Sequence, residues 1–128
     1  MKKYILIIGN GSYVLNDNYG KGVVLRSIIQ WNRINSNNSY RIIIFYRDEN
    51  KKNILENKLK NIEYSEQVIL KPLTDLESLI SSKEVFTSFI SIPDRNHYEY
   101  IEKFLFNKIP TWIVKPLTDN LEQAINIT

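Results

Sequence analysis

Five short apolar runs, separated by segments with helical periodicity, limit what this chain of 128 residues can fold into. The runs are continuous rather than alternating and contain many β-branched side chains. This pattern is typical of strands that are buried on both faces of a parallel sheet. The runs comprise Tyr4–Ile8, Ile42–Tyr46, Val68–Leu70, Val85–Ile92 and Trp112–Val114. We therefore expect five parallel strands.

Between the runs, apolar side chains recur at spacings of three and four residues, as on one face of a helix. Val24, Ile28 and Trp31 form the first such stripe. The other stripes comprise Ile54, Leu55 and Leu59; Leu76, Leu79 and Ile80; Tyr98, Ile101 and Leu105; and Leu121, Ala124 and Ile125. Thr74 and Glu77 have the spacing of a capping box, which predicts a helix start at Thr74. The sequence thus predicts one α/β domain over residues 1–128, with helices on both faces of its sheet.

The composition excludes several classes of protein. The chain has no cysteine and a single histidine, His97, so we expect no disulfide, cysteine nucleophile or metal site. The net charge of +3 is too small to indicate nucleic-acid binding. No apolar run is long enough to span a membrane, and no cleavage site follows the short apolar start. We therefore expect a cytoplasmic protein.

Ligands of an open parallel sheet bind beyond the carboxyl ends of its strands, so the residues after each run are the candidate site residues. Gly9, Asn10, Gly11 and Ser12 follow the first run. Glycines at these positions allow a tight turn and bring backbone N–H groups close to a pyrophosphate. The complete dinucleotide fingerprint has a third glycine where this chain has Val14. Either a later glycine in an extended loop takes that role, or the turn only connects strand to helix.

The residues after the second run indicate how an adenosine ribose would be bound. An acidic side chain usually accepts hydrogen bonds from that ribose, but here the position holds Tyr46, followed by Arg47. Arginine can pair with a 2′-phosphate and stack on adenine, which slightly favours NADP over NAD. Asp48 reaches the ribose if the strand is two residues longer. A solvated, charged turn explains this segment equally well.

The fourth and fifth runs end in further candidates. Pro93 ends the fourth run, and Asp94 or Asn96 can cap the helix after it. Taken alone, His97 is more typical of a packed or capping histidine than of a catalytic one. Lys115 follows the fifth run, where an ammonium group directed into the ligand crevice needs an anion or a carbonyl as its partner. We favour a functional role for Lys115 over that of a surface lysine.

The end of the chain resembles that of two families, which differ at the other strand ends. Ile113–Leu117, followed by a helical stripe, is similar to the end of the receiver domain of response regulators. A receiver also needs an acidic pair after its first strand and a phosphorylatable aspartate after its third. This chain has Gly9-Asn10-Gly11 and Lys71-Pro72 there. A receiver-like or degenerate module that binds a partner or a small ligand without catalysis remains the alternative prediction.

The second resemblance extends along nearly the whole chain and concerns the Gfo/Idh/MocA family of NAD(P)-dependent oxidoreductases. Gly9-Asn10-Gly11 resembles the dinucleotide turn of this family, and Leu73–Ile80 resembles its short helix before the fourth strand. Ser91–His97 resembles its Thr-Pro-Asn-x-x-His stretch. Lys108–Leu117 resembles its Gly-Lys-x-Val-x-x-Glu-Lys-Pro-Leu motif, and Leu121–Ala124 its Leu-Glu-Glu-Ala. The resemblance implies a Rossmann-like, doubly wound sheet.

The resemblance also implies a cofactor, NAD or NADP, and a substrate that is a sugar, a nucleotide sugar or a polyol. The cofactor-binding residues that it implies are Gly9, Asn10, Gly11 and Ser12 at the pyrophosphate, Tyr46 and Arg47 at the ribose, and Pro93, Asp94 and His97 beside the nicotinamide. Lys115 corresponds to the active-site lysine, which assists proton transfer during hydride transfer. The chain departs from the family at Val114, where the family has glutamate, and at Asp94, where it has asparagine.

Members of this family carry a second domain that supplies the contacts to the substrate. We expect that domain to be absent from this chain, and we expect the chain alone to be inactive. We also expect the last strand of the nucleotide-binding sheet to be missing. An exposed sheet edge has unpaired backbone groups, which makes a homo-oligomer a further expectation.

Overall fold

The computed structural model describes residues 2–9, 23–34, 40–62, 64–91 and 97–113, and shows strands that alternate with helices. In chain order, with η for 3₁₀ turns, the elements are β1 (Tyr4–Ile8), α1 (Val23–Ile34), β2 (Arg41–Tyr46), η2 (Glu49–Lys51), α2 (Lys52–Lys60), η3 (Ser65–Gln67), β3 (Val68–Pro72), η4 (Leu73–Asp75), α3 (Leu76–Ser81), β4 (Val85–Ile90), α4 (His97–Phe106) and β5 (Thr111–Ile113). The predicted α/β alternation is confirmed.

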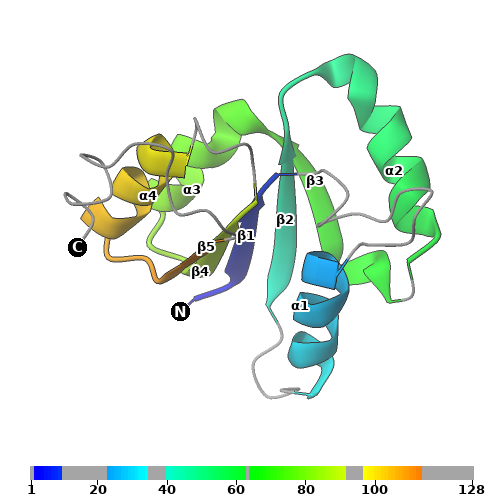
Figure 1. Cartoon of the computed structure of the whole chain (residues 1–128), viewed down its shortest axis with the longest axis horizontal. Helices are drawn as coiled ribbons and strands as arrows, with labels where there is room; N and C mark the ends of the chain where they lie inside the picture. Colours follow the sequence, from blue (N-terminus) through cyan, green and yellow to red (C-terminus); the bar gives the residue numbers. More distant parts are fainter. Residues whose placement is uncertain (1, 10–22, 35–39, 63, 92–96, 114–128) are drawn as a thin grey trace.

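All five strands are parallel and lie in the order β3-β2-β1-β4-β5. From β1 the chain proceeds to β2 and β3 on one side, and then returns to β4 and β5 on the other side. Helices α1 and α2 cover one face of the sheet, and α3 and α4 cover the opposite face (Figure 1). The fold is therefore the predicted Rossmann-like, doubly wound sheet, and its strand order reverses at β1.

Two apolar cores explain why the central runs are continuous. The first core joins the sheet to α1 and α2, and includes Ile5, Ile7, Ile42, Ile44, Leu25, Ile28 and Leu55. The second joins the sheet to α3 and α4, and includes Leu6, Ile8, Ile43, Phe45, Leu76, Ile101 and Phe104. Strands β3 and β5 are only partly buried, so the prediction of full burial is wrong for them. Each has a single neighbouring strand in the described part of the sheet.

An added residue interrupts the pairing of β4 with β1. Tyr4 pairs with Val85, but the next residue of β1, Ile5, pairs with Thr87. Phe86 is therefore an extra residue in the ladder, as in a β-bulge. Because of this shift, the side chains of Phe86 and Thr87 both contribute to the α1 side of the sheet.

Some predicted element boundaries are wrong, among them the start of α3 and the end of β4. The capping box at Thr74 does not form, because Thr74 lies inside η4 and α3 begins at Leu76 without a side-chain cap. The backbone N–H of Leu76 donates to the carbonyl of Leu73, so a 3₁₀ turn leads directly into the helix. Strand β4 ends at Ile90, two residues before the end of its apolar run.

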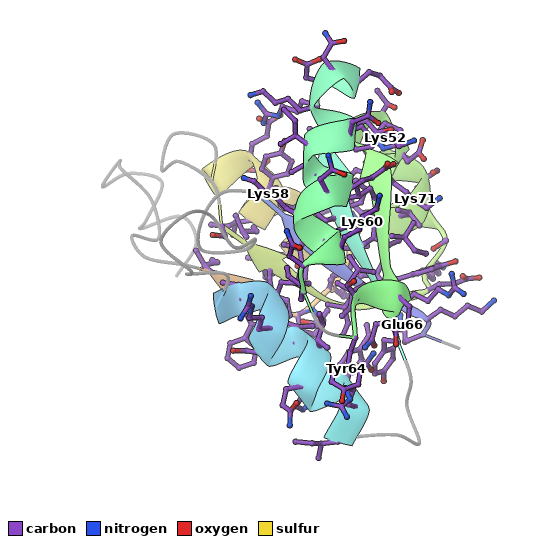
Figure 2. The ribbon with its side chains drawn as sticks, turned by 90° about the vertical axis from the view of Figure 1, so that its right-hand side faces the viewer. Lys52, Lys58, Lys60, Tyr64, Glu66 and Lys71 are labelled. Atoms are coloured by element: carbon purple, nitrogen blue, oxygen red, sulfur yellow. The ribbon has the colours of Figure 1, made fainter. Side chains whose placement is uncertain are left out.

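Lysines lie along the outer side of α2 and the edge strand β3. Figure 2 shows Lys52, Lys58 and Lys60 on the helix and Lys71 on the strand. A charged side chain on an edge strand opposes pairing with the edge of another sheet. The β3 edge is therefore poorly suited to strand addition. At the opposite edge of the described sheet, β5 presents Trp112 with 64% of its surface exposed.

Candidate functional site

The strand order places Gly9 at the centre of the carboxyl edge of the sheet. Ile7 pairs with Ile44 of β2, so Gly9 is level with Tyr46. On the other side, the backbone N–H of Ser91 donates to the carbonyl of Ile8 at 2.8 Å. Gly9 therefore lies where the strand order reverses, which is the ligand-binding position of a doubly wound sheet.

The backbone of Gly9 has a conformation that favours glycine. Its φ is 126°, in the region where a Cβ atom clashes with the backbone. The lack of a side chain also lets a ligand approach the backbone at the end of β1. The predicted role of Gly9 in a tight turn at this edge agrees with this geometry. Asn10, Gly11 and Ser12 lie outside the described residues.

Arg47 extends from the end of β2 toward the opposite side of this edge. Its Nη2 donates a hydrogen bond of 3.0 Å to the hydroxyl of Tyr100 in α4. Tyr100 is buried, with 6% of its surface exposed, whereas Arg47 is exposed. Because α4 follows β4, this hydrogen bond connects the two sides of the sheet edge across β1.

Tyr46 is buried beneath the edge rather than exposed upon it. Its ring belongs to the core on the α1 and α2 side, and only 4% of its surface is exposed. The hydroxyl lies 3.4 Å from Oε1 of Glu49, and the ammonium group of Lys52 lies 5.9 Å from the ring centroid. Only a small part of the Tyr46 side chain is exposed, so a ribose could contact Tyr46 mainly through its backbone.

Asp48 is engaged in local structure. Strand β2 ends at Tyr46, so the longer strand considered from the sequence does not form. The carboxylate of Asp48 instead accepts a 2.9 Å hydrogen bond from the backbone N–H of Asn50 and caps η2. Such a cap stabilises the start of a helix by about 1 kcal/mol.

The other predicted site residues remain predictions. Pro93, Asp94 and Lys115 lie outside the described residues. His97 is the first residue of α4, but its side chain is not among those described. Within the described ranges, no group of three or more His, Asp or Glu side chains could hold a metal ion. Among the described helices, none is long and apolar enough to cross a membrane.

Tyr100 is the site residue that the sequence analysis missed. The predicted helical stripe used Leu105, but Leu105 is 49% exposed, and the buried side chains among the described ones of α4 are Tyr100, Ile101 and Phe104. The stripe is thus wrong in this part. Tyr100 itself was a usable signal, because the hydroxyl of a tyrosine on the buried face of a helix normally requires a hydrogen-bonding partner. That partner, Arg47, is 53 residues away in the sequence.

A concave region lies on the α1 side of β4 and β5. It has a volume of about 470 Å³ and is lined by Ile5, Ser27, Ile28, Trp31, Phe86, Thr87, Phe89, Pro110 and Trp112. Trp31 and Tyr40 stack with Phe86, and Trp112 stacks with Phe89. No lining residue is charged, so this cleft does not provide what a pyrophosphate needs. The carboxyl edge around Gly9 remains the candidate site.

The fold is shared with several solved oxidoreductases. An NAD-binding oxidoreductase from Klebsiella pneumoniae has a TM-score of 0.64 and 17% identity, with 99% of this chain and 30% of that one covered. A 3-ketoreductase from Actinomadura kijaniata, solved with TDP-benzene and NADP, has a TM-score of 0.63 and 15% identity, with coverages of 99% and 34%. For an oxidoreductase from Bacillus cereus these values are 0.61, 22%, 98% and 31%.

The chain spans about a third of the length of these structures. No curated protein matches it. Its sequence does match the profile described as "Oxidoreductase family, NAD-binding Rossmann fold" over residues 22–128, a region that begins after the glycine turn. The match covers most of the chain, and the strand order and reversal point agree with it. The chain therefore belongs to the Gfo/Idh/MocA oxidoreductase family.

Proposed function

We propose that this chain binds a nicotinamide dinucleotide across the carboxyl edge of its sheet, as the cofactor domain of an oxidoreductase. The observation that carries the proposal is the placement of Gly9, with φ of 126°, at the point where the strand order reverses. A glycine there allows the phosphates to approach the backbone closely. Membership of an NAD-binding family supports the same conclusion.

In this proposal, the first turn and the end of β2 hold the adenosine half of the cofactor. The backbone N–H groups of Asn10, Gly11 and Ser12 donate to the pyrophosphate. Tyr46 contributes through its backbone, since its side chain is buried. The exposed guanidinium of Arg47 provides a partner for a 2′-phosphate, which favours NADP over NAD.

The proposed chemistry is reversible hydride transfer to a sugar, a nucleotide sugar or a polyol. The bound cofactor supplies or accepts the hydride. Pro93, Asp94 and His97 lie beside the nicotinamide half in this proposal. Lys115 hydrogen-bonds the reacting oxygen of the substrate and moves its proton. A nucleotide sugar agrees with the TDP-benzene bound to the Actinomadura kijaniata 3-ketoreductase.

The contacts to the substrate would come from a second domain, since the chain spans only about a third of its structural neighbours. We therefore expect the 128-residue chain to bind the cofactor without turning over a substrate. A cytoplasmic location and a homo-oligomer formed through the β5 edge belong to the same proposal. Size-exclusion chromatography with light scattering tests the oligomer directly.

Amide chemical shifts recorded during NADPH titration test the proposed site. We expect the largest changes at Gly9, Arg47 and Ser91, which surround the carboxyl end of β1. Trp112 in the apolar cleft and Lys60 on the outer side of α2 serve as internal controls and should not shift. Changes centred on the cleft would overturn the proposed location. A titration without any changes would favour the alternative, a degenerate module that has lost its cofactor.

A further inference from the structure

One hydrogen bond connects the two sides of the candidate site. Nη2 of Arg47 donates to the hydroxyl of Tyr100, and the two residues belong to elements on opposite sides of β1. Arg47 directly follows β2, whereas Tyr100 lies in the first turn of α4, the helix after β4. The hydrogen bond therefore joins elements that flank β1, the strand at which the strand order reverses.

The two partners differ in their exposure to solvent. Tyr100 has 6% of its surface exposed, so its ring is held by the core on the α3 and α4 side. Arg47 is exposed, and a guanidinium group has five N–H donors in a fixed planar arrangement. The buried phenol therefore anchors one nitrogen of Arg47 at a fixed place, and the guanidinium keeps donors for an anion.

The acidic neighbours of Arg47 in the sequence make their hydrogen bonds to other groups. Asp48 accepts from the backbone N–H of Asn50, and Glu49 lies against the hydroxyl of Tyr46. Within the described part of the chain, the ion pairs are Lys3 with Glu84 and Lys103 with Glu77, and neither includes Arg47. Among the described residues, no acidic side chain forms an ion pair with Arg47, so an anionic ligand at this edge would meet a charged guanidinium held by Tyr100.

We propose that Tyr100 is a positioning residue that orders Arg47 for the 2′-phosphate of NADP. This inference rests on the proposed function, because it assumes that the adenosine ribose binds at the end of β2. A free arginine side chain loses rotamer freedom when it binds a phosphate, and this loss weakens binding. The Tyr100 hydroxyl restricts the Arg47 side chain before the ligand binds, so Arg47 loses less rotamer freedom on binding. NADH has no 2′-phosphate and gains nothing from this arrangement.

The test compares Tyr100→Phe with a matched control, Tyr64→Phe. Tyr64 also contacts an arginine, but it does so through its ring, with the guanidinium carbon of Arg33 3.4 Å from the ring centroid. Calorimetric titration of the full 128-residue chain gives dissociation constants for NADPH and NADH. We expect Tyr100→Phe to weaken NADPH binding about three- to tenfold while NADH binding changes less than about twofold. Tyr64→Phe should change neither constant.

A double-mutant cycle separates positioning from a general structural effect. Once Arg47→Met has removed the guanidinium, adding Tyr100→Phe should not alter the NADPH-to-NADH ratio further. Thermal unfolding of each variant checks that the fold is retained. If Tyr100→Phe is too unstable to titrate, 2′,5′-ADP and 5′-ADP are titrated against wild type and Arg47→Lys. If Arg47→Lys keeps the full preference for 2′,5′-ADP, the inference is overturned, because a planar guanidinium positioned by Tyr100 would then be unnecessary.

The outcomes separate the inference from the proposed function. If wild type binds NADPH and Tyr100→Phe leaves the ratio of the two constants unchanged, the inference is wrong and the proposed function stands. An equal loss for NADPH and NADH would assign Tyr100 a structural role and also overturn the inference. If wild type binds neither dinucleotide, the proposed function fails, and the inference fails with it.

Discussion

Replacing Asn32 with alanine should destabilise the fold although Asn32 lies far from the candidate site. The side chain sits in α1 with 3% of its surface exposed. Its Nδ2 donates to the carbonyl of Tyr40 at 2.7 Å and also to Oε1 of Gln67, and its Oδ1 accepts from the N–H of Tyr40 at 3.0 Å. One amide thus pairs both backbone groups of the residue that leads into β2.

The expected loss of unfolding free energy follows from the hydrogen bonds removed and the polar groups that lose their partner. Alanine removes three hydrogen bonds and leaves the N–H and carbonyl of Tyr40 without this partner. A net hydrogen bond contributes about 1 kcal/mol, and leaving a buried partner unsatisfied adds to that cost. We therefore expect Asn32→Ala to lower the free energy of unfolding by about 3 kcal/mol. For a chain of this size, the melting temperature should fall by about 10 °C.

Urea unfolding followed by circular dichroism measures this loss. The matched control is Asn61→Ala, since Asn61 is exposed and its amide makes only a 3.5 Å contact with the carbonyl of Asn57. We expect the control to change the unfolding free energy by less than about 0.5 kcal/mol. A loss below about 1 kcal/mol for Asn32→Ala would show that these three partly buried hydrogen bonds contribute little to stability, contrary to this prediction.

Three further predictions concern single contacts. Gly9→Val should lower NADPH affinity at least about tenfold by calorimetry, because a Cβ at φ of 126° both strains the turn and obstructs the phosphates; unchanged affinity would contradict the site. The hydrogen bond to Glu77 raises the pKa of Lys103 above its ordinary value of 10.5. The interaction of Lys103 with Glu77 should contribute its full stabilisation below pH 10.5 and lose it as the pH rises through the raised pKa. The small difference in unfolding free energy between wild type and Glu77→Gln should therefore vanish at high pH. A difference that persists there would have another cause. Thr87→Val removes the 2.8 Å hydrogen bond to the carbonyl of Pro110 and should lower the unfolding free energy by about 1 kcal/mol in urea, whereas no loss would show that the β4–β5 pairing does not depend on it.

The strands could be predicted from the sequence because burial on both faces leaves a direct pattern. Tyr4–Ile8 coincides with β1, whose side chains enter the two cores alternately. Strand ends were less predictable, since backbone pairing decides them. Strand β3 continues to Pro72 because Lys71 and Pro72 still pair with β2, although neither belongs to an apolar run.

The sequence pattern did not predict the bulge in β4. Phe86 and Phe89 are three residues apart, and simple alternation places them on opposite faces. The added residue moves both to the α1 side, where Phe86 stacks with Tyr40 at a centroid distance of 4.4 Å. This register shift depends on how β4 pairs with β1, a contact about 80 residues apart in the chain.

The candidate site was predictable in its position and less so in its contacts. The rule that ligands bind at the carboxyl ends of strands identified Gly9 and Arg47. The same rule could not indicate that Asp48 caps η2, or that Arg47 meets Tyr100. The second contact depends on the order β2-β1-β4, which brings α4 across from the end of β2.

Calorimetric titration of the 128-residue chain with NADPH and NADH tests whether this domain binds a nicotinamide dinucleotide. We expect a single site with micromolar affinity for at least one dinucleotide, and tighter binding of NADPH because of Arg47. Gly9→Val in parallel should weaken the binding at least about tenfold if the site lies at the end of β1. Absence of binding by wild type up to millimolar concentrations of both dinucleotides would overturn the proposed cofactor site, and would leave the Rossmann-like sheet as a feature of ancestry only.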